Sequence, residues 1–255
     1  MIVDVFMFDN ELDMLECHLY QLAGIVDRFI AIEGNTTFTG IPKRYHLSDN
    51  LDRFKGYPLE VMRVDMTGPT GPILERPWMM PGTIDNWWRE AVQRNGARRL
   101  LADLPDDTIL IYGDVDEIPR RYVVKGFDGG PKVMSMTMLI YSTKLWFPGS
   151  WAGSVIGRKR DIGIDVSEIR NTHWGFPPIE DAGWHLSWFG NPTWREEKLR
   201  HQSHQELVTI SDVIGSDYPA RHLHVDGKTP LWDYGGDLPS WIAEGHGPEE
   251  WMREW

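Results

Sequence analysis

The first 33 residues constrain the fold most, because an amphipathic run separates two short apolar runs. Residues 2–8 are almost wholly apolar, which is typical of a strand buried on both faces. Leucines spaced three or four residues apart then predict a helix that begins at an Asn10 cap and ends at Gly24. Residues 28–33 form the next strand. A strand, a helix and a strand with short links predict a right-handed parallel crossover.

The rest of the chain continues this pattern and then becomes less regular. The further expected elements are strands at 59–64, 108–112, 133–141 and 145–147, helices at about 83–104 and 192–207, and a long Pro- and Gly-rich loop at 68–82. We therefore predict one α/β domain over residues 1–255, with a mostly parallel, Rossmann-like sheet flanked by helices. The C-terminal third is expected to be irregular.

Composition excludes several classes of protein. A single cysteine, Cys17, rules out a disulfide framework and a Cys-rich zinc site. The net charge of −12 argues against binding nucleic acid by phosphate neutralisation. No apolar run approaches the roughly 20 residues of a membrane span, and the N-terminus does not resemble a signal peptide. We expect a soluble, cytoplasmic protein. The 13 tryptophans suit either core packing or stacking against sugar rings.

The most informative motif is an acidic turn that directly follows the apolar strand 108–112. Asp114 and Asp116 fall on the same side of an extended chain, about 7 Å apart. Ligands bind at the carboxyl ends of strands in open α/β sheets. Carboxylate oxygens suit Mn²⁺ or Mg²⁺, and a nucleoside diphosphate would complete the coordination. The alternative is a solvated acidic turn without a ligand.

Other polar residues stand near the expected ends of the strands or the helix before the acidic turn. Arg94 is expected to meet a diphosphate, to hold the acidic turn, or to be solvated. Glu33 and Asn35 end the second strand, where they suit either a ribose or base contact or a local cap. Asp9 ends the first strand and has the same two interpretations, of which capping is favoured.

Five segments, taken in order, resemble glycosyltransferase family 17. They are residues 5–13, 32–40, 113–119, 182–188 and 203–206. The resemblance implies a GT-A fold, a UDP-sugar donor, a divalent cation (Mn²⁺ or Mg²⁺) and inversion at the anomeric carbon. The transferred sugar would be one such as N-acetylglucosamine, and the acceptor a glycan or glycoconjugate. Residues 1–125 would bind the nucleotide sugar, and residues 126–255 would face the acceptor.

Site residues are expected in three groups. On this resemblance, the metal ligands would be Asp114, Asp116 and His185, and the donor contacts Asp9, Glu33, Asn35, Arg94 and Asp114. The resemblance does not assign the general base, for which Glu180, Asp181 and Glu117 are candidates; Asp181 is favoured because it lies just before the Gly-Trp-His segment. For His185, the alternative is a buried structural histidine. If it does reach the donor, Trp184 and Trp188 should flank it, one packed inward and one available to a sugar.

Other functions fit the same sequence. A protein of this fold could bind glycans or nucleotide sugars without catalysis. A glycosyltransferase could also act on modified DNA bases, using the basic residues 158–160, or on a bacterial or phage protein. Release of UDP in the presence of Mn²⁺ would separate an enzyme from a binding protein.

Overall fold

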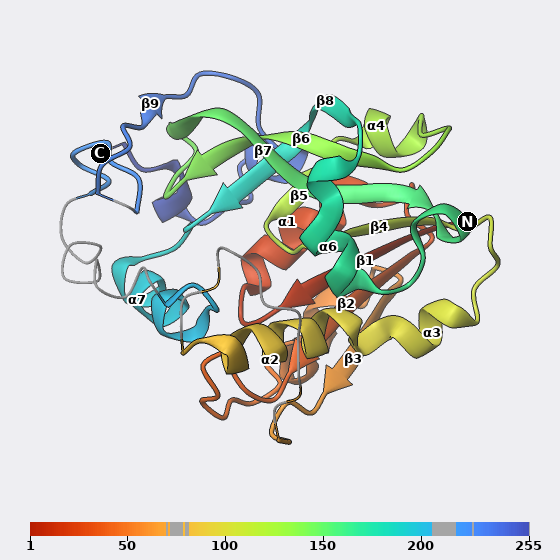
Figure 1. The fold of residues 1–255 in the computed structure, drawn as a ribbon. Helices are drawn as coiled ribbons and strands as arrows, with labels where there is room; N and C mark the ends of the chain where they lie inside the picture. Colours follow the sequence, from red (N-terminus) through yellow and green to blue (C-terminus); the bar gives the residue numbers. More distant parts are fainter. Residues whose placement is uncertain (70, 72–78, 80–81, 206–217, 226, 255) are drawn as a thin grey trace.

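The computed structural model describes residues 1–69, 71, 79, 82–205, 218–225 and 227–254. Within these residues the chain forms a nine-stranded mixed sheet with helices on both faces (Figure 1). The strands are β1 Ile2–Phe8, β2 Arg28–Gly34, β3 Leu59–Val64, β4 Ile109–Asp114, β5 Glu117–Pro119, β6 Lys132–Ile140, β7 Leu145–Arg158, β8 Pro178–Ser187 and β9 Trp232–Asp233. Their order is β3-β2-β1-β4-β7-β6-β8-β5, and β9 pairs with β7.

Helical segments connect and cover these strands. The α-helices are α1 Leu12–Leu22, α2 Ile84–Arg94, α3 Arg98–Ala102, α4 Arg121–Lys125, α5 Lys159–Ile162, α6 Val166–Thr172, α7 Pro192–His201 and α9 Ser240–Ala243, and the 3₁₀ turns are η1 Ser48–Phe54, η2 Asn95–Ala97, η3 His173–Gly175 and η5 Glu249–Met252. None of the helices in the described part of the chain is long and apolar enough to cross a membrane.

The sheet has a parallel half and a largely antiparallel half. Strands β3, β2, β1 and β4 are all parallel, which confirms the predicted Rossmann-like half. Beyond β4 the sheet continues with β7 and β6, each antiparallel to its predecessor, followed by β8 parallel to β6. This α/β arrangement, with an acidic turn at the carboxyl edge of the parallel half, agrees with the expected GT-A-like fold.

Side chains that alternate along β1 pack into two hydrophobic clusters, one on each face of the sheet. Val3 and Val5 pack in a cluster with residues of η2, α3 and α6. Phe6 and Phe8 point to the opposite face and pack against the apolar stripe of α1. Successive strand residues face opposite sides of a sheet, so one buried strand supports both layers. The carboxyl edge of the parallel strands is thereby held rigidly between two packed layers.

Two details of the predicted helices differ. The helix expected over 83–104 agrees in extent with α2, η2 and α3 together, but the 3₁₀ turn η2 interrupts it, where Asn95 donates to Asp165 Oδ1 (3.1 Å). Helix α1 begins at Leu12 without an Asn10 cap, and Oδ1 of Asn10 accepts from Trp194 Nε1 instead (3.3 Å). Glu11 Oε2 accepts the backbone N–H groups of Asp9 and Asn10 (3.1 and 3.0 Å).

The second half follows its predicted elements with different lengths. β6 agrees with the expected strand, and the short strand expected at 145–147 extends to Arg158 as β7. Helix α7 begins with Pro192 in its first turn, and the Asn191 side chain caps it by accepting from Trp194 N (2.9 Å). The helix ends at His201, and the expected end near 207 lies outside the described residues, as does most of the 68–82 loop.

Candidate active site

The acidic turn lies at the carboxyl edge of the parallel strands. Asp114 is the last residue of β4 and pairs in register with Met7 near the end of β1. Val115 and Asp116 form the turn, and Glu117 begins β5, which pairs with β8. Ligands of open α/β sheets bind at this edge. The sequence placed this turn correctly.

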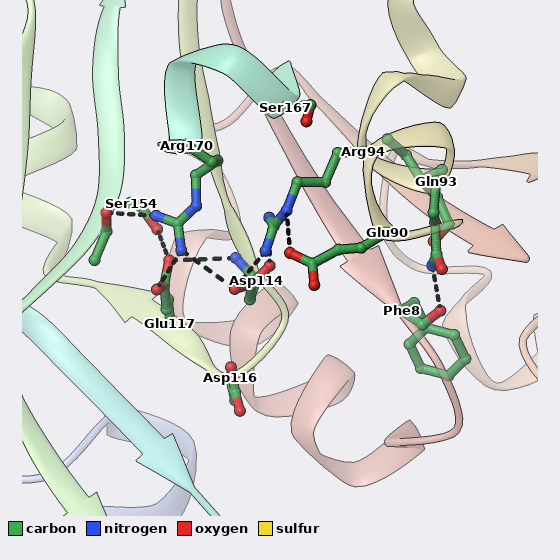
Figure 2. A network of polar contacts seen from close by, with 12 residues as sticks. Phe8, Glu90, Gln93, Arg94, Asp114, Asp116, Glu117, Ser154, Ser167 and Arg170 are labelled. Carbon is green, nitrogen blue, oxygen red and sulfur yellow. Dashed lines mark hydrogen bonds and ion pairs between the residues drawn. The ribbon is translucent and has the colours of Figure 1, made fainter. Parts of the chain in front are cut away.

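Two arginines hold Asp114 from opposite sides (Figure 2). Arg94 of α2 donates to Asp114 Oδ1 (2.9 Å), and Arg170 of α6 donates to Oδ2 (3.2 Å). Burial alone would raise the pKa of Asp114, but the charges of the two arginines outweigh it and hold the pKa below its ordinary value. Arg94 therefore holds the acidic turn, one of the roles considered for it. Both oxygens of the Asp114 carboxylate are engaged by arginines, and its assignment as a metal ligand stays a prediction.

Glu117 is fully buried beneath the turn. Its carboxylate accepts hydrogen bonds from Trp151 Nε1, Ser154 Oγ and Arg170 Nη2, at 2.8, 2.9 and 2.8 Å. The backbone of Gly113 packs so closely that an added Cβ would lie 2.2 Å from Ser154 Oγ. A carboxylate enclosed in this way has no access to an acceptor hydroxyl. The expectation that Glu117 is the general base is corrected to a structural role.

Asp116 points away from this network, toward α7 and β8 (Figure 2). Lys198 Nζ donates to Asp116 Oδ2 (3.1 Å), and His185 Nε2 lies 3.6 Å from Oδ1. Burial would raise the pKa of Asp116, but Lys198 and His185 hold it well below the ordinary range. Asp116 is thus ionised and faces a lysine and a histidine that come from the second half of the chain.

His185 lies where the proposed donor contact requires it. Its ring packs on Trp151 with centroids 4.6 Å apart, and its Nδ1 is buried with no hydrogen-bond partner in the described part of the chain. The expected closeness of His185 to Asp116 is confirmed. One flanking tryptophan was expected to pack inward and the other to be available to a sugar. Trp184 and Trp188 are both buried, so the first expectation is confirmed and the second was wrong.

A cavity of about 280 Å³ opens beside Asp116. Its lining includes Glu11, Arg53, Asp116, Trp194 and Lys198. Burial and the nearby carboxylates raise the pKa of Glu11. Burial would lower the pKa of Lys198, but Asp116 and Glu11 raise it, so the ammonium is charged.

Sequence reasoning missed Glu11, Lys198 and Trp194 as cavity residues. The neighbouring Asp9 and Asn10 were interpreted mainly as caps, and Glu11 binds the backbone there with one oxygen. Residues 194 and 198 lie four apart on α7, which puts both side chains on one helix face. That spacing was visible, but only the fold shows that this face turns toward Asp116.

Asp9, although close to the cavity, is engaged by other parts of the protein. Lys43 Nζ and His201 Nδ1 each lie 3.1 Å from one of its carboxylate oxygens. Burial would raise the pKa of Asp9, but these two partners lower it. The residue joins the end of β1 to the end of α7, beyond the local capping role that was favoured.

Glu33 and Asn35 are also occupied. The carboxylate of Glu33 is fully buried and accepts from Leu47 N (2.8 Å), so the capping interpretation describes it and the nucleoside contact does not. Asn35 donates to Asp65 Oδ1 (2.9 Å) and accepts from Met66 N (2.9 Å). Both residues organise the ends of β2 and β3 instead of facing the cavity.

Asp181 lies away from Asp116, on the part of β8 that pairs beyond Pro119. It precedes His185 by four residues, a separation of roughly 13 Å along a strand. Its side chain is 64% exposed and pairs with Arg120 at 2.8 Å. The expectation that Asp181 is the general base beside Asp116 is corrected on this distance.

Fewer residues than predicted are grouped where they could bind a divalent cation. Among the residues that the structure describes, no three His, Cys, Asp or Glu side chains are grouped to hold a metal ion. Asp116 and His185 remain together, with Nε2 of His185 3.6 Å from Oδ1 of Asp116. Mg²⁺ typically binds through one or two carboxylates together with substrate phosphates. These residues fit a divalent cation whose coordination a diphosphate completes.

Comparison with known proteins places this arrangement in a family. Residues 1–220 match glycosyltransferase family 17. The chain belongs to that family. A curated relative, the β-1,4-mannosyl-glycoprotein 4-β-N-acetylglucosaminyltransferase of Rattus norvegicus, is 24% identical over 225 residues, which are 75% of this chain. The chain spans only 40% of the length of that relative.

Solved structures similar to this family 17 chain share little sequence with it. A putative glucose-1-phosphate thymidylyltransferase from Bacillus anthracis is 12% identical, with a TM-score of 0.37 and coverage of 72% of this chain and 88% of that one. The galactosyltransferase LgtC is 14% identical, with a TM-score of 0.33 and coverage of 98% and 99%.

Proposed function

We propose that this family 17 chain transfers a sugar, N-acetylglucosamine or a related hexose, from a UDP-sugar to a glycan or glycoconjugate acceptor with inversion. The observation that carries the proposal is the cavity at the carboxyl edge, into which Asp116 and Lys198 both point. The name of the curated relative supports the choice of sugar. The ionised carboxylate and the ammonium side by side suit a cation and a diphosphate respectively.

Each residue beside the cavity then has a distinct task. Asp116 and His185 would hold a divalent cation, which when bound supplies positive charge to the departing nucleotide. Lys198 adds a second positive charge at the same place, on a residue of the chain itself. Trp194 and Trp188 lie beneath the lysine, with their ring centroids 5.2 and 5.7 Å from Nζ, and they restrict where it can move.

Inversion by direct displacement also requires a group that accepts the proton of the acceptor hydroxyl. With Glu117 enclosed and Asp181 remote, the cavity offers Glu11 and Glu250 instead. Glu11 has one oxygen fixed by two backbone N–H groups, and its raised pKa is the property that a proton acceptor near neutral pH needs. We propose these two carboxylates as the bases to test.

The experiment that tests the function is UDP release from a panel of UDP-sugars, with and without Mn²⁺. We expect release with at least one UDP-hexose, strongly reduced by EDTA and restored by Mn²⁺. A donor at a hundredfold excess over its dissociation constant should also stabilise the protein by about 2.7 kcal/mol. Stabilisation without UDP release would indicate a binding protein. Neither effect with any nucleotide sugar would contradict the proposal.

Replacing Lys198 with methionine should change two affinities in opposite directions. Affinity for UDP should fall roughly 10- to 100-fold, because a charged hydrogen bond to the diphosphate is lost. Affinity for Mn²⁺ alone should rise, because the ammonium no longer competes for Asp116. Both are measured by titration calorimetry. Arg200→Met, on the exposed side of the same helix, is the matched control and should change neither. A parallel loss of both affinities in Lys198→Met would show that Lys198 only supports the structure.

A further inference from the structure

A buried histidine of α1 contacts the backbone of the acidic turn. His18 is 1% exposed, and its Nδ1 lies 3.0 Å from the carbonyl oxygen of Val115, the residue between Asp114 and Asp116. Its Nε2 lies 2.8 Å from Oδ2 of Asp4, a β1 residue that is equally buried.

The chemistry of the two contacts fixes how the ring is protonated. A carbonyl oxygen can only accept a hydrogen bond, so Nδ1 carries a proton and donates it to Val115. A second hydrogen bond joins His18 Nε2 and Asp4 Oδ2, and either atom can be its donor while Nδ1 still donates to Val115. A carboxylate placed behind an imidazole fixes its tautomer and orientation, as it does for histidines that bind metals. Asp4 therefore aims His18 at the turn.

Both backbone carbonyls of the turn are bound, and by different layers of the fold. His18 on α1 holds Val115 O, whereas Leu186 N on β8 donates to Asp116 O (2.8 Å). The backbone that carries the Asp116 side chain is thus fixed from two directions. Of these two anchors, only the histidine is a side chain that can be removed by substitution.

The Asp4 and His18 pair is enclosed by apolar side chains. The His18 ring packs on Phe6 at 4.8 Å within an apolar core, and Asp4 Oδ1 is buried with no hydrogen-bond partner in the described part of the chain. Exchanging a buried polar pair for apolar residues of similar volume is often neutral or stabilising. What apolar residues cannot supply is the directed N–H group.

We propose that Asp4 and His18 are positioning residues, which hold the Val115 carbonyl so that the Asp116 carboxylate meets Lys198 and the cation that would bind the donor diphosphate. The predicted effect on donor binding rests on the proposed function, whereas the contact between His18 and the Val115 carbonyl does not. Neither residue lines the cavity, so their effect reaches the donor through the turn.

The test is the double variant Asp4→Val/His18→Leu, which removes the donor and leaves no unpaired buried charge. Leu15→Ala, in the same buried face of α1, is the matched control for loss of packing. In the double variant we expect faster hydrogen exchange in residues 113–117 and a roughly 10- to 100-fold lower affinity for UDP with Mn²⁺, the range found for residues that orient ligands indirectly. Leu15→Ala should show neither effect at temperatures well below its melting point.

Three results would overturn the inference. Unchanged exchange at 113–117 would show that His18 does not hold the turn. Faster exchange with unaltered UDP affinity would show that the turn does not need to be held. Equal effects in Leu15→Ala would assign both to packing. If the wild-type protein binds no UDP, the proposed function fails, whereas the exchange measurement still decides whether the pair fixes the turn.

Discussion

Sugar transfer should fall by at least about 10²- to 10³-fold when Asp116 is replaced by asparagine, the size of effect seen when one charge-stabilising group is removed from an active site. The amide keeps the shape of the side chain but loses the charge that pairs with Lys198 and would hold a cation. The measurement is the rate of UDP release at saturating donor and Mn²⁺.

The fold should survive this substitution, because the Asp114 and Glu117 network does not include Asp116. Asp128→Asn is the matched control, since its carboxylate is 91% exposed and pairs with Arg158, which lies opposite Ile109 at the other end of β4 from Asp114. It should retain full activity. An Asp116→Asn protein with more than about a tenth of wild-type activity would remove Asp116 from the centre of the site.

The largest loss of stability is expected for Arg170→Met. Arg170 Nη2 donates to both Glu117 and Asp114, and Glu117 is fully buried. Removing one partner of a buried ion pair leaves an uncompensated charge, which typically costs 3–5 kcal/mol, so we expect a decrease of about that size. Urea unfolding followed by tryptophan fluorescence measures it.

Two further variants test whether the loss of stability in Arg170→Met comes from the uncompensated buried charge. Arg98→Met removes a 57% exposed guanidinium paired with Asp165 at 3.6 Å and should cost under about 1 kcal/mol. Adding Glu117→Gln to Arg170→Met should recover part of the stability, because the buried carboxylate becomes neutral. A loss in Arg170→Met no greater than that in Arg98→Met would contradict the account of the network.

The ion pairs of Arg170 also predict how the stability difference between the wild type and Arg170→Met depends on pH. The pKa of Asp114 is lowered in the fold, so its contribution is present above the ordinary carboxyl pKa of about 4 and is lost as the pH falls through the folded value. The stability difference between wild type and Arg170→Met should therefore shrink below about pH 4. A difference that grows on acidification would have the wrong sign.

Local sequence pattern was enough to predict the parallel half and the place of the acidic turn. The apolar runs of β1, β2 and β4 and the leucine stripe of α1 each belong to one contiguous segment, so periodicity reveals them. A turn that follows a buried strand must lie at the edge of the sheet. The position of Asp116 followed from these facts alone.

The partners of the acidic residues could not be predicted in this way. Arg170 lies 56 residues after Asp114, and Lys198 lies 82 residues after Asp116, so only the tertiary fold pairs them. For the same reason Asp114 and Asp116 looked equivalent in sequence, although two arginines engage one and a lysine meets the other. Asp181 was misplaced because its distance from the turn depends on the register between β5 and β8.

The most direct test of the central claim is a crystal structure of the protein with UDP and Mn²⁺. The account predicts a diphosphate within hydrogen-bonding distance of Lys198 Nζ, a cation on Asp116, and Asp114 still held by Arg94 and Arg170. A nucleotide bound elsewhere, or a cation on Asp114 with Arg94 displaced, would contradict it.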